Sequence, residues 1–155
     1  AYIDKFAGEH FLLFYDDLMS QVASSAMAQD VACKLSHHRN FSCISLTQNV
    51  FVQGRNARNQ SLNSMYYLLT RSCRDLRQIS TLGNQLFPGR GSKFMDAYMD
   101  SVDKPFDDDG GKTDDRRAVN VAALYVSCHP VKTERNFQLL SSIFPPGGAM
   151  VLYRI

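Results

Sequence analysis

The apolar positions of this 155-residue chain gather in short runs separated by polar segments, and each run has the length of a β-strand. The first run, at 11–15, is continuously apolar and ends at two aspartates. Such a run is typical of a strand buried on both faces of a parallel sheet. The other runs predict strands at 41–46, 64–69, 121–126 and 149–153, and a short element at 136–144.

Helical spacing of apolar residues occupies 18–35, between the first two strands. The order strand, helix, strand predicts a βαβ unit and therefore a parallel sheet. Two more helices are predicted at about 73–86 and 93–102, with Ser72 and Ser92 as their N-caps. Residues 103–120 are rich in aspartate and poor in apolar side chains, which predicts a surface insertion loop in a single domain spanning 1–155.

Composition excludes several classes of protein. Hydrophobic residues make up 45% and charged residues 21%, as in soluble globular proteins, and no apolar run approaches the roughly 20 residues of a membrane helix. The net charge of +2 is nearly balanced, although arginines gather in the middle third. The four cysteines are far apart and form no CxxC pair, so we expect reduced thiols in a nuclear or cytosolic protein rather than a secreted one.

Polar side chains follow the first two predicted strands, where ligands bind in open α/β sheets. An apolar strand followed by two acids is the Walker B pattern, in which we assign Asp16 to Mg²⁺ through water and Asp17 to the attacking water. Gln48 follows the second strand and has an amide that can donate to and accept from a phosphate or its water. Thr47 and Asn49 flank it as candidate nucleotide contacts. The alternative is an ordinary solvated turn after each strand.

The segments LLFYDDLM and SHHRNFSCISLTQNVFVQGRNARNQSLNS resemble the FtsK/HerA-type packaging ATPases of Polinton (Maverick)-like and adintovirus-like elements. The resemblance runs from about Phe11 to Phe87 and resumes at 122–144, in LYVSCHPVKTERNFQLLSSIFP. It implies a P-loop NTPase-like three-layer sandwich of the additional-strand type, with a mainly parallel sheet. The implied activity is ATP-driven translocation of double-stranded DNA into a capsid.

That resemblance also implies ATP and Mg²⁺ as cofactors, a homo-oligomeric ring, and a capsid or portal protein as candidate partner. The family requires an arginine that reaches the ATP of a neighbouring subunit and stabilises charge in the transition state. The candidates are Arg39, Arg55, Arg58 and Arg71. Arg58 and Arg71 are favoured because they follow the second predicted strand, which carries the sensor-like Gln48 at its end, and lie near the ends of the third predicted strand. The alternative for each is a solvated surface arginine.

One departure from the family pattern concerns the phosphate-binding loop. The chain contains no GxxxxGK sequence followed by Ser or Thr, so we expect the Walker A segment upstream of Ala1, or no Walker A segment at all. The segment from Gly89 to Lys93 has suitable residue types in the wrong order. The enzyme prediction therefore depends on another segment, and the alternative is a non-catalytic or domesticated ATPase-derived module that binds DNA or capsid protein.

Overall fold

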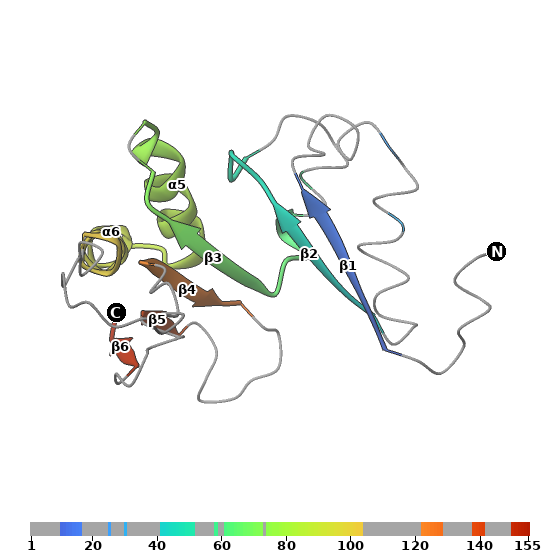
Figure 1. Cartoon of the computed structure of the whole chain (residues 1–155). Helices are drawn as coiled ribbons and strands as arrows, with labels where there is room; N and C mark the ends of the chain where they lie inside the picture. Colours follow the sequence, from blue (N-terminus) through green and yellow to red (C-terminus); the bar gives the residue numbers. More distant parts are fainter. Residues whose placement is uncertain are drawn as a thin grey trace, which may run out of the picture. The chain divides into compact units, whose positions relative to one another are not determined.

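The computed structural model describes residues 10–16, 25, 30, 41–51, 58, 61–72, 74–103, 122–128, 138–141 and 150–155. The chain divides into two compact units, Ala1–Ser64 and Met65–Ile155. The described elements are strands in both units and two helices in the second unit (Figure 1).

The first unit contains a parallel pair of strands, β1 (Phe11–Asp16) and β2 (Phe41–Leu46). In their register Phe11 lies opposite Phe41 and Asp16 opposite Leu46, so the strands begin and end together. This confirms the predicted strands and their parallel pairing. Of the predicted helix at 18–35, the structure describes Asp30, which is helical, and Ser25, which is not, and the other residues lie outside the described part of the chain.

Side chains of β1 alternate between half-buried and exposed, as successive residues of a strand point to opposite faces. Leu12 is 64% exposed and Phe14 is 53% exposed. On the same face of β2, Ile44 and Leu46 are exposed as well. The prediction that the first strand is buried on both faces is therefore wrong, because one face of this pair is open.

The second unit contains a four-stranded sheet in the order β3-β4-β5-β6, formed by β3 (Tyr66–Thr70), β4 (Ala123–Ser127), β5 (Leu139–Ser141) and β6 (Val151–Tyr153). These strands confirm the predicted elements at 64–69, 121–126, 136–144 and 149–153. Every pair in this sheet is antiparallel. We expected one mainly parallel sheet. Among the described strands, β1 and β2 are instead the one parallel pair, and β3 to β6 form an antiparallel sheet.

Helices α5 (Leu76–Leu86) and α6 (Gly91–Val102) follow β3 and confirm the two predicted helices of this unit (Figure 1). Helix α6 packs on β4, and α5 packs on α6. Apolar side chains at helical spacing on α6 meet the inner face of the sheet. The buried hydrophobic core of the described residues consists of Leu69, Ile79, Leu82, Phe94, Ala97, Tyr98, Val102, Ala123, Leu124, Val126 and Leu139.

The helix starts differ from the predicted caps. The N-cap of α5 is Asp75, whose Oδ1 accepts a hydrogen bond from the backbone N–H of Gln78 at 3.3 Å, so the assignment to Ser72 is wrong. Helix α6 begins one residue before Ser92, which therefore lies inside the first turn. Its N-cap, Arg90, makes no side-chain cap bond.

The close packing of the two helices depends on Gly83. A Cβ at this position would overlap the ring of Phe94 on α6, so the glycine allows α5 and α6 to approach each other. Residues 104–121, which hold nearly all of the predicted insertion loop, lie outside the described part of the chain.

Candidate nucleotide site at the end of the parallel strands

The site predicted from the sequence is centred on the carboxyl ends of β1 and β2. Asp16 is the last residue of β1 and lies opposite Leu46, the last residue of β2, which Thr47 follows directly. Because paired strands lie about 4.8 Å apart, the backbones of Asp16 and Thr47 reach the same edge of the sheet. The structure thus brings Asp16 and the polar segment after β2 together at one edge, as the sequence predicts.

The polar groups at this edge face solvent. Asp16, Thr47, Gln48 and Asn49 are all exposed, and Gln48 and Asn49 each take part in interactions within the chain. One carboxylate, one hydroxyl and two amides provide oxygen ligands of the kind that Mg²⁺ prefers. The edge therefore fits a hard cation held by few protein oxygens and completed by water and phosphate oxygens.

No group of three or more histidine, cysteine or acidic side chains suited to holding a metal occurs among the described residues. This is compatible with Mg²⁺ at a nucleotide site, because Mg²⁺ there is usually bound through one or two carboxylates and substrate phosphates. A closed structural metal centre would need more protein ligands than the described part of this edge supplies.

Tyr15 adjoins the site from within β1. Burial, and to a lesser extent the neighbouring Cys43 thiol group, raises the pKa of the Tyr15 hydroxyl above its ordinary value. The phenol therefore stays neutral near pH 7 and does not act as a base. Tyr15 and Asp16 point to opposite faces of β1, because they are consecutive residues of a strand.

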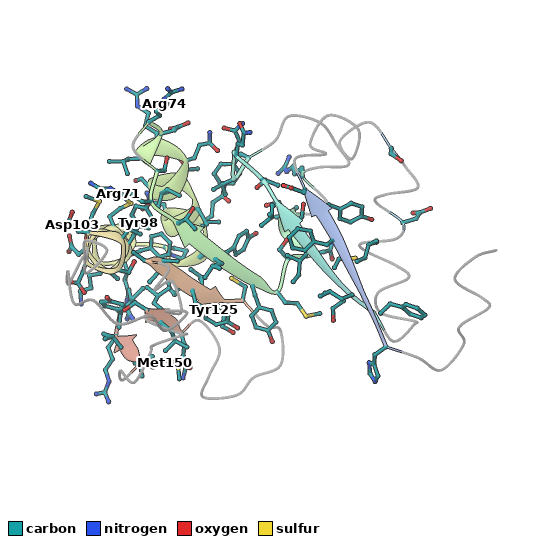
Figure 2. All side chains as sticks on the ribbon, viewed as in Figure 1. Arg71, Arg74, Tyr98, Asp103, Tyr125 and Met150 are labelled. Carbon is teal, nitrogen blue, oxygen red and sulfur yellow. The ribbon has the colours of Figure 1, made fainter. Side chains whose placement is uncertain are left out.

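The remaining predicted site residues are distributed over the chain. Asp17, Arg39 and Arg55 lie outside the described residues. Arg58 is exposed and belongs to the first unit. Arg71 is exposed, directly follows β3, and belongs to the second unit (Figure 2).

A second polar cluster, which the sequence did not predict, joins α6 to the last strand. The Tyr153 hydroxyl donates to Asp100 Oδ2 at 2.6 Å and lies 3.1 Å from the Ser141 hydroxyl. Burial first, and then the hydrogen bond to Asp100, raises the pKa of Tyr153. The tyrosine is thus held as a donor, which makes the cluster a tether for β6 rather than a catalytic base.

The C-terminal residue is tethered to the helices in the same way. Arg90 Nη1 donates to the backbone oxygen of Ile155 at 2.7 Å. No local sequence motif signals either contact, because the partners are 53 and 65 positions apart.

Comparison of the chain with protein-family models, with curated proteins and with solved structures gives no match. In the described part of the chain, no helix is both long enough and apolar enough to cross a membrane.

Proposed function

We propose that this chain supplies the Walker B and sensor elements of an ATP-driven motor that packages double-stranded DNA into a capsid. The observation that carries the proposal is the parallel pairing of β1 and β2, which puts Asp16 and the segment from Thr47 to Asn49 at one edge. Additional-strand P-loop ATPases need this arrangement, an acid-tipped strand beside a strand with a polar tip. The resemblance of LLFYDDLM and of the segment around Gln48 to packaging ATPases supports the same function.

In this proposal the residues at the edge have separate roles. Asp16 accepts hydrogen bonds from water on Mg²⁺, and Asp17 orients and deprotonates the attacking water. Gln48 donates to a γ-phosphate oxygen and accepts from the same water, since its amide has both groups. Thr47 and Asn49 contact the nucleotide beside it. When bound, MgATP supplies the phosphoryl group that is transferred to water.

The proposed enzyme is a homo-oligomeric ring with a P-loop sandwich architecture. Arg58 or Arg71 of one subunit would stabilise charge at the ATP of its neighbour. A phosphate-binding loop must come from a segment other than this sequence, which contains no GxxxxGK. We place the motor in the host nucleus or cytoplasm, with a capsid or portal protein as its partner.

The test is DNA-stimulated ATP hydrolysis by a protein that joins this chain to a GxxxxGK loop. Asp17→Asn should lower kcat by about 10²- to 10⁴-fold, the usual contribution of a positioned base. Asp103→Asn, a change of an exposed carboxylate at the end of α6, is the matched control and should leave kcat unchanged. Equal turnover of Asp17→Asn and the control would reject the role of Asp17.

The arginine can be identified by mixing subunits. Arg58→Ala or Arg71→Ala subunits mixed with unchanged ones should lower ring activity more steeply than their mole fraction if that arginine acts on a neighbour's ATP. Loss in strict proportion to the mole fraction would assign the arginine to its own subunit or to the surface.

A second candidate function is favoured by the arginine-rich middle of the chain. In that case the chain is an ATPase-derived module without catalysis that binds DNA or a capsid protein. A protein with a GxxxxGK loop that binds DNA but shows no MgATP hydrolysis would support this function over the motor.

A further inference from the structure

The outer face of α5 has an unusual composition for an exposed helix face. Its exposed polar positions at helical spacing are Arg77, Thr81, Asn84 and Gln85, and Leu76 in the first turn is exposed beside them. The helix contains no acidic residue at all. Exposed helix faces usually carry charges of both signs, which improves solubility and pairs neighbouring turns. This face instead presents arginine and uncharged hydrogen-bonding groups.

Two more arginines precede the helix. Arg71 and Arg74 are exposed, and Figure 2 shows Arg74 at the end of the unit where α5 begins, pointing away from the ribbon. Within the described part of the chain, the guanidinium groups of Arg71, Arg74 and Arg77 form no ion pair. No described carboxylate therefore neutralises the positive charge at this end of α5 through an ion pair.

Asp75 is the one acidic residue in the sequence from 71 to 86, and its carboxylate already accepts hydrogen bonds. Asp75 caps the helix through Oδ1, and its Oδ2 accepts a hydrogen bond from Gln78 Nε2 at 2.6 Å. Its carboxylate is thus oriented toward the helix backbone and Gln78. It lowers the net charge of the region, and no other carboxylate of the described residues forms an ion pair with the three arginines.

The position of Arg77 is unfavourable for the stability of the helix. It lies in the first turn of α5, where the macrodipole disfavours a cation by about 0.3–1 kcal/mol. A local choice that opposes stability, without a compensating ion pair in the described residues, is typical of a functional surface.

We propose that this surface, defined by Arg74, Arg77, Thr81 and Gln85, binds the phosphate backbone of nucleic acid. Arginine, threonine and glutamine are among the side chains that contact phosphate oxygens in such complexes. The four residues that define the surface are all polar, and the large aliphatic side chain exposed on α5 is Leu76 alone among the described residues, which argues against a membrane surface. The inference depends on the proposed function only in naming duplex DNA as the nucleic acid.

Two side chains of the face have limited donor capacity, which indicates what kind of contact to expect. The Thr81 hydroxyl donates to the backbone oxygen of Arg77 at 2.8 Å, and Asn84 Nδ2 donates to that of Ser80 at 3.0 Å. The arginines and Gln85 thus provide most of the contacts. Charge contacts of this kind give affinity without base specificity.

The experiment measures binding of the complete chain to a fluorescein-labelled DNA duplex of mixed sequence by anisotropy, without nucleotide. Salt is varied between about 50 and 200 mM, because released counterions make the logarithm of affinity fall linearly with the logarithm of salt concentration. Arg77→Gln should lower the magnitude of this slope by about 1, and Arg74→Gln with Arg77→Gln by about 2. Arg77→Lys should restore the slope, since it keeps the charge.

Arg154→Gln is the matched control, because Arg154 is exposed and follows β6 rather than preceding α5. It carries the same change of charge and should leave the slope unchanged. An equal effect of Arg154→Gln and Arg77→Gln would overturn the inference, since net charge alone would then explain binding. Tighter binding to phosphatidylserine vesicles than to duplex would also overturn it.

The outcome is separable from that of the proposed motor. Binding that depends on Arg74 and Arg77 supports the surface even where ATP hydrolysis is absent. A salt slope that is the same in the double variant and the unchanged chain rejects the surface even where ATP hydrolysis depends on Asp17.

Discussion

Tyr98 shows how one side chain fixes the turn between β3 and α5. Its ring is fully buried, and its hydroxyl donates to the backbone oxygen of Thr70 at 3.0 Å. The Tyr98 hydroxyl oxygen in turn accepts a hydrogen bond from the backbone N–H of Ser72 at 2.9 Å. The phenol therefore pairs two backbone groups that follow β3 and leave its ladder, as buried polar groups require.

Tyr98→Phe should destabilise the chain by about 1–3 kcal/mol, because two backbone groups lose their partner while the ring still fills its place. Chemical denaturation measures this loss as a change in the free energy of unfolding, with the same denaturant dependence (m-value) used for both proteins. Tyr153→Phe is the control, since the Tyr153 hydroxyl contacts the side chains of Asp100 and Ser141 and not the backbone. A loss no larger at Tyr98 than at Tyr153 would contradict the proposed role of the buried hydroxyl.

Cys128 follows β4, and burial raises the pKa of its thiol from 9.0 to about 11. Because the folded pKa lies above the unfolded one, the related stabilisation is complete below about pH 9 and is lost as pH rises toward 11. At pH 8 only about 0.1% of the thiol is ionised, so alkylation should be roughly 100-fold slower than for an ordinary cysteine.

Mass spectrometry after iodoacetamide treatment measures the rate at Cys128 from pH 7 to 10. The rate should rise about tenfold per pH unit throughout, since the thiolate is the reacting form. Addition of denaturant should remove the difference from an ordinary thiol. A plateau of the rate below pH 10 in the folded chain would contradict the raised pKa.

At the scale of elements, the start of α5 tests which polar residue caps the helix. Asp75→Ala should cost about 1 kcal/mol, because the first-turn N–H of Gln78 loses its acceptor. Ser72→Ala should cost less, since the Ser72 hydroxyl accepts a long bond, at 3.4 Å, from the N–H of Asp75. Denaturant midpoints of both variants measure the difference. A larger loss for Ser72→Ala would restore Ser72 as the more important residue at this end.

The positions of elements were more predictable than their pairing. The five predicted strands and the two helices of the second unit are found within a few residues, because apolar runs and helical spacing are local properties. The direction of β3 to β6 is not local, since it depends on which strands become neighbours. The caps could not be distinguished because serine and aspartate both suit an N-cap, and the backbone geometry decides between them.

The candidate site was predictable for a related reason. Residues that follow two consecutive strands joined by a crossover come to the same edge when the strands pair, as Asp16 and Thr47 do. The arginine contribution was not predictable in this way. Arg71 follows β3, which belongs to the other sheet. No rule of sheet geometry therefore links Arg71 to the edge formed by β1 and β2.

At the scale of the whole molecule, the two sheets differ in how completely they are covered. In the second unit, one face of the sheet is closed by α6, and Leu124, Val126 and Leu139 are completely buried. In the first unit, Leu12, Phe14, Ile44 and Leu46 are exposed on the parallel pair. Parallel sheets are normally covered on both faces, and a two-stranded sheet is marginal alone. The described part of the first unit therefore has less apolar burial to stabilise it than the second.

This difference predicts unequal local stability. Amide hydrogens of β4 should exchange most slowly, because β4 is paired on both sides, with β3 and β5, and its side chains fill the core. Those of β1 should exchange faster, since its outer face is open to water. Hydrogen exchange of the complete chain, followed by mass spectrometry of peptides, measures both strands in one sample. Leu139→Ala should accelerate exchange in β4 and leave β1 unchanged if the units open separately. Equal protection of β1 and β4 would instead mean that the open face of the parallel pair is covered in solution.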